Sequence, residues 1–243
     1  MTERLDPAEP VPGPLSRWSA AVYWFMVVEA MLVLTSMPAI IAIPLLDRDA
    51  SNIPLAALAV VPLGPAVSGA LFAWRRFDSD LDLSPARHFW RGYRLNVLDA
   101  LRVWVPALLV LTVVGINLAN LGATGLPSGV GILNAVIGLA VVLWTVHAVV
   151  VVSIFAFRLR DAARIARYYL FGRPLVTLGV LSLAVLATGV VLVTSDWVLV
   201  ALGSVFTFLL WRNARPMVAD VQRRFVAPPD DETPPDDEAP PQA

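Results

Sequence analysis

Long runs of apolar residues alternate along the chain with short polar segments that carry arginine. Six of these runs predict membrane-crossing helices, because about 20 apolar residues span the hydrocarbon core of a bilayer. The last run is short, and we expect it either to extend further or to lie in thinned lipid. The predicted spans cover residues 17–46, 54–74, 103–118, 130–157, 175–194 and 197–211.

The second apolar run has the features of a broken helix that packs closely on a neighbour. Pro62 and Pro65 lie inside it and remove backbone donors, which is tolerated where neighbouring helices cover the freed carbonyls. Small residues recur four positions apart around these prolines, beginning with Gly64 and Ser68. This spacing predicts close contact between two helix backbones.

Two polar stretches are predicted to prolong neighbouring spans as cytoplasmic helical stems. Ser84 followed by Pro85 is a favourable helix start, and from there a helix can run unbroken into the third span. The fourth span is expected to continue as a charged helix to Tyr169, before the breaking sequence at residues 172–174.

The placement of arginine predicts the orientation in the membrane. All 18 cationic residues are arginine, and with the amino terminus inside, every one except Arg48 falls in a cytoplasmic segment. Cytoplasmic loops of membrane proteins carry such an excess of positive charge. We therefore predict an all-α polytopic transmembrane helical bundle of six spans in the plasma membrane, with both termini cytoplasmic and two spans extended as cytoplasmic stems.

Composition agrees with this assignment and removes several classes of function. Of the 243 residues, 58% are hydrophobic and 15% are charged, whereas soluble domains carry about 25% charged residues. The chain has no cysteine, which excludes disulfides and thiolate chemistry. A net charge of −1 gives no overall basic field for nucleic acid. The complete absence of lysine is typical of a GC-rich bacterial genome.

The two ends of the chain differ from its apolar body. Residues 1–15 are polar and rich in proline, and residues 218–243 are acidic and repeat the sequence Pro-Pro-Asp-Asp-Glu. Segments of this composition bury too little apolar surface to offset the entropy of the ordered chain. We therefore predict two disordered tails that flank a membrane domain at residues 16–217.

The motifs that accompany catalysis do not occur in this sequence. Only His88 and His147 supply imidazole, and the chain holds no H-E-x-x-H, no G-x-S-x-G and no phosphate-binding glycine loop. Ser128 and His147 lie about 28 Å apart along one predicted helix, too far for a nucleophile and its base. We predict no catalytic, cofactor or metal site, and a protein that is not an enzyme.

Two polar residues fall in the middle of predicted spans, Glu29 in the first and His147 in the fourth. Both are expected about 15 Å from the cytoplasmic ends of their helices, at matching depth. A buried carboxyl group needs a partner, so one hypothesis is a Glu29–His147 contact that shares a proton. The alternative is that Glu29 bonds a backbone carbonyl or a hydroxyl such as that of Thr35 or Thr145, while His147 only packs.

The two predicted stems each carry a stripe of arginines at helical spacing. Such stripes could grip anionic lipid heads or dock a cytoplasmic partner. The alternative is that they only orient the protein in the membrane, as basic residues at helix ends commonly do. The residues concerned are Arg87, Arg91 and Arg94 in the first stem and Arg160, Arg164 and Arg167 in the second.

Three stretches follow a recognisable order: residues 24–38, residues 64–71, and the sequence Phe-Trp-Arg-Gly-Tyr-Arg-Leu-Asn at residues 89–96. This order resembles the YesL-like family of bacterial membrane proteins, a domain of unknown function. Where that family shows asparagine in the middle of the first span, this chain has Glu29. The resemblance implies a link to carbohydrate uptake, and it implies no catalytic residue.

Taken with the arginine stripes, the resemblance leads to an expected function. We expect a non-enzymatic accessory or regulatory protein that acts through its cytoplasmic helices on a subunit of a carbohydrate transporter. The alternative is a small-solute transporter that uses its intramembrane polar residues. Either protein would have the lipid bilayer as a partner, would need no cofactor and would bind no nucleic acid.

Overall fold

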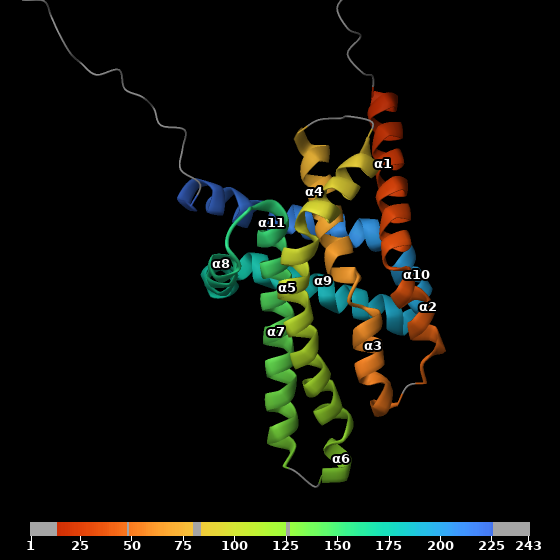
Figure 1. Cartoon of the computed structure of the whole chain (residues 1–243), viewed down its shortest axis with the longest axis vertical. Coiled ribbons are helices and arrows are strands. Elements are labelled where there is room, and N and C mark those ends of the chain that lie inside the picture. Colours follow the sequence, from red (N-terminus) through yellow and green to blue (C-terminus); the bar gives the residue numbers. More distant parts are fainter. Residues whose placement is uncertain (1–13, 48, 80–83, 125–126, 226–243) are drawn as a thin grey trace, which may run out of the picture.

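The described part of the chain is predominantly helical. The computed structural model describes residues 14–47, 49–79, 84–124 and 127–225, and these contain no strand (Figure 1). In chain order the elements are α1 (Pro14–Thr35), α2 (Met37–Leu45), the 3-10 turn η1 (Ala50–Asn52), α3 (Ile53–Ala59), α4 (Leu63–Ser79), α5 (Pro85–Ala119), α6 (Leu121–Thr124), α7 (Ser128–Ile154), α8 (Leu159–Gly172), α9 (Pro174–Val193), α10 (Asp196–Ala201) and α11 (Gly203–Phe225).

Four of these helices, α1, α5, α7 and α9, are long and apolar enough to cross a membrane. A fifth span results if α3 and α4 are counted together, because these two helices form one apolar path bent by 41° at a short break. Pro62 falls in that break, as the sequence predicts. The described residues therefore supply four or five candidate spans rather than six.

The predicted sixth span does not form one apolar helix. Its residues divide between α10 and α11 at Leu202, and α11 then continues to Phe225. The predicted boundary of the acidic tail at residue 218 thus falls inside a helix, where Val218 and Val221 are buried. The prediction assigned residues 218–225 to the tail because charged residues surround the few apolar positions in this segment.

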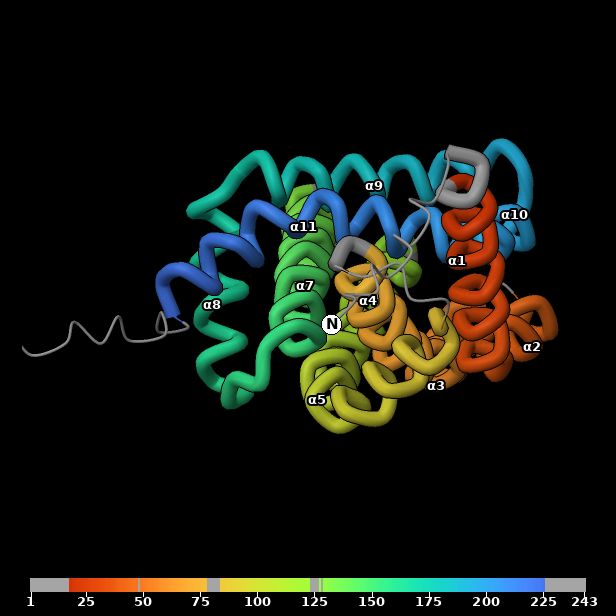
Figure 2. The backbone as a smooth tube through the Cα atoms, turned by 90° about the horizontal axis from the view of Figure 1, so that it is seen from above, coloured from red at the N-terminus to blue at the C-terminus, as the bar shows by residue number. Residues whose placement is uncertain are grey.

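The helices form two groups with different directions. Helices α1, α4, α5 and α7 run roughly along the long axis of the molecule and appear end-on in the view from above (Figures 1 and 2). Helices α9 and α11 pack against each other and cross one side of this group at a steep angle. The fifth and sixth predicted spans are thus not parallel to the other four.

The predicted helix start at Pro85 is confirmed, and α5 runs unbroken for 35 residues. The predicted continuation of the fourth span to Tyr169 is wrong, because α7 ends at Ile154 and α8 begins at Leu159. Two side chains capture the last carbonyls of α7: Arg75 Nη1 donates to Ile154 O at 2.9 Å, and Asn96 Nδ2 donates to Ser153 O at 3.1 Å. With those carbonyls bonded from outside, the chain turns away into a separate helix.

The close helix contact predicted from the small residues of the second apolar run is confirmed, and the structure identifies the partner of α4 as α5. A Cβ atom added at Gly64 would lie 2.5 Å from Trp104 Cγ, and one added at Gly69 would lie 3.1 Å from the Phe89 carbonyl oxygen. The absence of these side chains lets the helices approach, which increases dispersion contacts between them.

An aromatic cluster joins α4 to α1 and α11. Trp74 is fully buried, and its ring centroid lies 4.7 Å from that of Phe25 and 5.1 Å from that of Phe208. The Trp74 indole Nε1 donates to Thr207 Oγ1 at 3.1 Å, which satisfies the polar atom of the ring. Because these rings come from three helices, their burial fixes the crossing of α11 over the main group.

Candidate functional site

Glu29 lies on α1 where that helix meets the beginning of α11. Its Oε2 accepts a hydrogen bond from the backbone N–H of Ser204, in the first turn of α11, at 2.5 Å. The first N–H groups of a helix have no partner within the helix, and a carboxylate near them interacts favourably with the helix dipole. Glu29 therefore caps α11 from another helix. The other carboxyl oxygen, Oε1, is buried and has no hydrogen-bond partner.

His147 is buried on α7 and bonds to the region where α8 gives way to α9. Its Nδ1 lies 2.8 Å from the carbonyl oxygen of Leu143, so this nitrogen carries a hydrogen. Its Nε2 lies 3.4 Å from Thr177 Oγ1 on α9, and the Thr177 hydroxyl lies 3.0 Å from the Leu170 carbonyl oxygen of α8. His147 thus forms part of a hydrogen-bonded connection between three helices.

Glu29 and His147 bond to different parts of the molecule. Glu29 bonds to α11, His147 bonds to its own helix and to α9, and within the described residues no hydrogen bond or ion pair joins the two. Neither hydroxyl suggested for Glu29 serves it: Thr35 bonds Met31 O at 2.7 Å, and Thr145 bonds Val141 O at 2.6 Å. A proton relay between Glu29 and His147 stays a prediction.

The first arginine stripe lies on the exposed side of α5, where Arg87, Arg91 and Arg94 all face outward. Phe89 on the opposite side of α5 is fully buried. Trp90, in contrast, is 46% exposed and stacks on Tyr93 with ring centroids 5.5 Å apart. This part of α5 therefore presents both cations and an aromatic ring.

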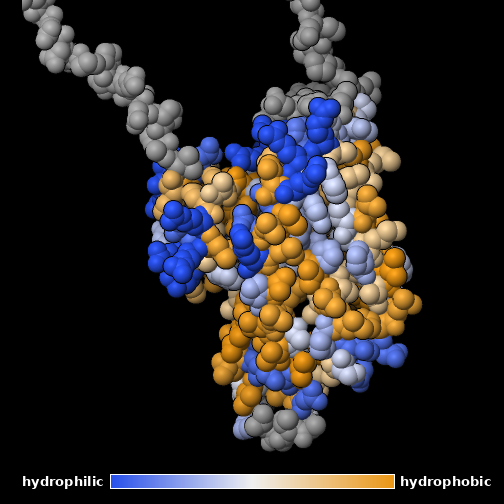
Figure 3. All heavy atoms as spheres, in the orientation of Figure 1, coloured by the Kyte–Doolittle hydropathy of each residue, from blue (hydrophilic) through white to orange (hydrophobic). Residues whose placement is uncertain are grey.

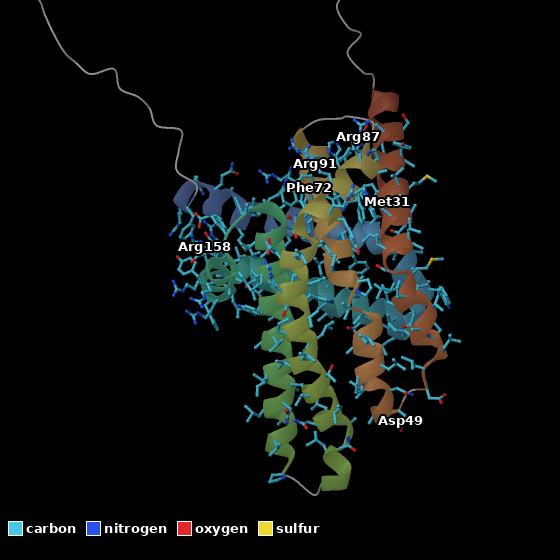
Figure 4. The ribbon with its side chains drawn as sticks, in the orientation of Figure 1. Met31, Asp49, Phe72, Arg87, Arg91 and Arg158 are labelled. Carbon is cyan, nitrogen blue, oxygen red and sulfur yellow. The ribbon has the colours of Figure 1, made fainter. Side chains whose placement is uncertain are left out.

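The second stripe lies on α8, an amphipathic helix. Its inner side buries Ala162, Ile165 and Ala166. The residues Arg160, Arg164 and Arg167 are exposed on the other side, and we call them, together with Arg87, Arg91 and Arg94, the arginine surface. Hydrophilic residues gather at the upper and left parts of the face in Figure 3, and Figure 4 places Arg87, Arg91 and Arg158 there and Asp49 at the opposite end.

A buried carboxylate on α11 holds α8 in place. Asp220 Oδ2 accepts from the Tyr169 hydroxyl at 2.7 Å, and the same carboxylate pairs with Arg173 at 3.2 Å and with Arg224 at 3.2 Å. The Tyr169 hydrogen bond, aided by Arg224 and Arg173, lowers the pKa of Asp220. Burial, followed by the bond to Asp220, raises the pKa of Tyr169. We call Asp220, Tyr169, Arg173 and Arg224 the Asp220 cluster.

Sequence reasoning did not find the Asp220 cluster. Tyr169 and Asp220 are 51 residues apart, and Asp220 belongs to the segment assigned to the acidic tail. The available signal was local: Arg223 and Arg224 follow Asp220 at the spacing of helical neighbours, and Arg224 makes its ion pair across one turn. That spacing indicates a helix but does not identify its partner on α8.

Among the described residues, no group of three or more His, Asp or Glu side chains is placed to hold a metal ion. Comparisons of the chain with protein-family models, curated proteins and solved structures found no match. The fold and the arginine surface together define a class: an all-helical protein with several apolar helices suited to a membrane and exposed arginines on α5 and α8.

Proposed function

We propose that the protein is embedded in the plasma membrane with both termini on the cytoplasmic side. The arginine distribution supports this orientation. The hairpin of α9 and α11 supports it as well, because α11 runs back alongside α9 and the chain leaves this region on the side where it enters (Figure 2). The proposed orientation is thus compatible with a hairpin that crosses the bilayer twice and with one that lies along it.

Reporter fusions distinguish the six-span arrangement from one with four spans. A phosphatase reporter is active only outside the cell, and a fluorescent reporter is active only inside it. Under the six-span arrangement, we expect a cytoplasmic signal after Arg76, Tyr169 and Arg224, and an external signal after Asp49, Ala123 and Asp196. If only the fusion after Asp196 departed from this pattern and gave a cytoplasmic signal, the number of spans would be four and both termini would still be inside. An external signal after Arg224 would contradict the proposed orientation.

The function proposed for this protein is that of a non-enzymatic accessory component which docks on a subunit of a carbohydrate transporter. The observation that carries the proposal is the α8 part of the arginine surface, Arg160, Arg164 and Arg167, on a helix that the Asp220 cluster joins to α11. A docking surface gains affinity when the element that carries it is already in place before binding, and the bond between Tyr169 and Asp220 joins α8 to α11. Exposed cations along one side of such a helix suit an acidic cytoplasmic surface on the partner. The link to carbohydrate rests on the resemblance to the YesL-like family.

Charge variants of α8 test the docking proposal. We expect the wild-type protein, cross-linked in native membranes and purified, to carry a transporter subunit at fixed stoichiometry. Replacing Arg160, Arg164 and Arg167 with glutamine should reduce recovery of that subunit about tenfold or more, because each rim charge lost weakens the electrostatic attraction. The same three positions replaced with lysine form the matched control, which keeps the charge and should retain most of the partner.

The outcomes separate docking from orientation and from independent transport. If the glutamine variant inserts normally and keeps its partner, the three arginines are not needed for binding, and the proposal of docking through α8 is wrong. If it fails to insert, their role is to orient the protein. A wild-type protein that purifies alone and moves a solute in liposomes would instead favour the small-solute transporter.

A further inference from the structure

An apolar pocket of about 420 Å³ lies between α1, α2, α4, α10 and α11, with one further lining residue, Ala187, from α9. Its volume falls in the range of roughly 300–1,000 Å³ that is usual for small-molecule sites. The pocket lies at the side of the molecule where α1, α2 and α10 are found (Figures 1 and 2). Most of the lining is aliphatic or aromatic, including Leu32, Ile40, Val200 and Phe206.

Ser36 supplies a polar group inside this apolar lining. The residue is 7% exposed, its Oγ is buried, and that oxygen has no hydrogen-bond partner. An unsatisfied buried hydroxyl costs free energy, whereas a ligand with a hydroxyl group would satisfy it. The neighbouring Thr35 offers a contrast, since its hydroxyl is satisfied by the Met31 carbonyl at 2.7 Å.

A second buried oxygen without a hydrogen-bond partner, Oε1 of Glu29, lies next to the lining of the pocket. Glu29 precedes Ser36 by two helical turns, and Leu32, which lines the pocket, lies between them. Gly203 also lines the pocket, and a Cβ atom there would lie 3.3 Å from Glu29 Oε1, the carboxyl oxygen without a partner. The missing side chain at Gly203 therefore leaves Glu29 next to the pocket.

The surroundings of the pocket identify the chemistry of its occupant. Large apolar side chains beside it are exposed, among them Leu45 at 79% and Leu58 at 67%, which suits a surface covered by lipid tails. The lining contains no cation, and its one charged residue is Asp196. Asp196 in the lining and Glu29 next to it are both acidic, which disfavours a ligand with an anionic head group.

We propose that this pocket binds a neutral long-chain lipid alcohol from the surrounding bilayer. The chain lies along the aliphatic lining, and the hydroxyl of the ligand forms a hydrogen bond with Ser36 Oγ. Binding thus satisfies the buried hydroxyl that the protein leaves unpaired. The proposal is independent of docking at the arginine surface, which lies on other helices.

Photolabelling in phosphatidylcholine nanodiscs tests this site, with diazirine-bearing hexadecanol as the probe. We expect labelled peptides from the pocket lining. Val200→Phe, which fills the pocket, should reduce that labelling about fivefold or more. Val198→Phe is the matched control: it lies on the same helix, is exposed and is not part of the lining. It should leave the labelling unchanged.

Ser36→Ala tests the polar contact without adding volume. Loss of one hydrogen bond should weaken competition by unlabelled hexadecanol about threefold to tenfold, while Thr35→Val, which removes a satisfied hydroxyl, should not weaken it. Labelling that Val200→Phe does not reduce would mean that the probe is merely dissolved in lipid, and the site would be wrong. Equal or stronger competition by hexadecanoic acid or hexadecylamine would overturn the neutral alcohol as the ligand.

Discussion

Replacing Gly92 with alanine is expected to lower the free energy of unfolding by about 1–3 kcal/mol, the usual cost of inserting atoms into a packed core. Gly92 is buried on α5 against Phe72 of α4. A Cβ atom at this position would overlap Phe72 Cβ and Cγ, which lie at the base of that side chain. A change of rotamer cannot move Cβ, so the two helices would have to separate and lose contacts along their length.

Gly189 on α9 provides the matched control for this substitution. Among the described residues, no atom beyond the adjoining backbone of α9 itself lies within 4 Å of a Cβ added there. Gly189→Ala should therefore stabilise the protein by roughly 0.5–1 kcal/mol, since alanine costs less backbone entropy than glycine in a helix. Chemical unfolding in detergent measures both variants. Opposite signs support the close approach of α4 and α5, whereas a stabilising Gly92→Ala would show that the helices are further apart there.

Local features of the fold could be predicted because they depend on neighbouring residues. Proline at position 85 starts a helix wherever that segment lies, and small residues at helical spacing favour close packing with any partner. The position of α9 and α11 could not be predicted in this way. Their apolar sequence fits a membrane span, but their steep crossing is set by rings from other helices, such as Trp74 against Phe208.

The candidate site was predicted less well than the fold, for a related reason. The cost of burying Glu29 predicted that it would have a partner. The partner is the backbone N–H of Ser204, 175 residues away. This N–H is free to donate to a partner because a helix begins there, after the break between α10 and α11 at Leu202, and the pattern of side chains in the sequence does not indicate that break. The arginine stripes could be found because helical spacing is visible in the sequence, and all six of their arginines are exposed.

Removing the carboxylate of Asp220 is expected to loosen α8 and to lower the melting temperature by several degrees. Asp220 is 5% exposed and accepts from the fully buried Tyr169 hydroxyl, so Asp220→Asn replaces a charge-assisted hydrogen bond with a weaker neutral one. It also leaves Arg173 and Arg224 without their anion. These arginines are partly exposed, so water screens much of the loss and the buried bond to Tyr169 dominates.

Asp99→Asn is the control, because Asp99 pairs with Arg102 at 2.9 Å but both side chains are well exposed. It should change the melting temperature little. A double-mutant cycle with Tyr169→Phe isolates the buried bond: the double variant should cost less than the sum of the two single variants. Strict additivity, or an Asp220→Asn variant that melts like Asp99→Asn, would show that the cluster does not hold α8.

The same comparison has an expected pH dependence. The pKa of Asp220 is lower in the folded protein than its ordinary value, so its contribution is complete above that value, about 3.9, and is lost as the pH falls through the folded pKa. The pKa of Tyr169 is raised, so its contribution is complete below about 10 and is lost only as the pH rises further. The difference in melting temperature between the wild type and Asp220→Asn should therefore be constant from about pH 5 to 9 and narrow below about pH 4. A difference that widened on acidification would mean that Asp220 is bound more strongly in its protonated form, and the cluster would then stabilise α8 by hydrogen bonding alone.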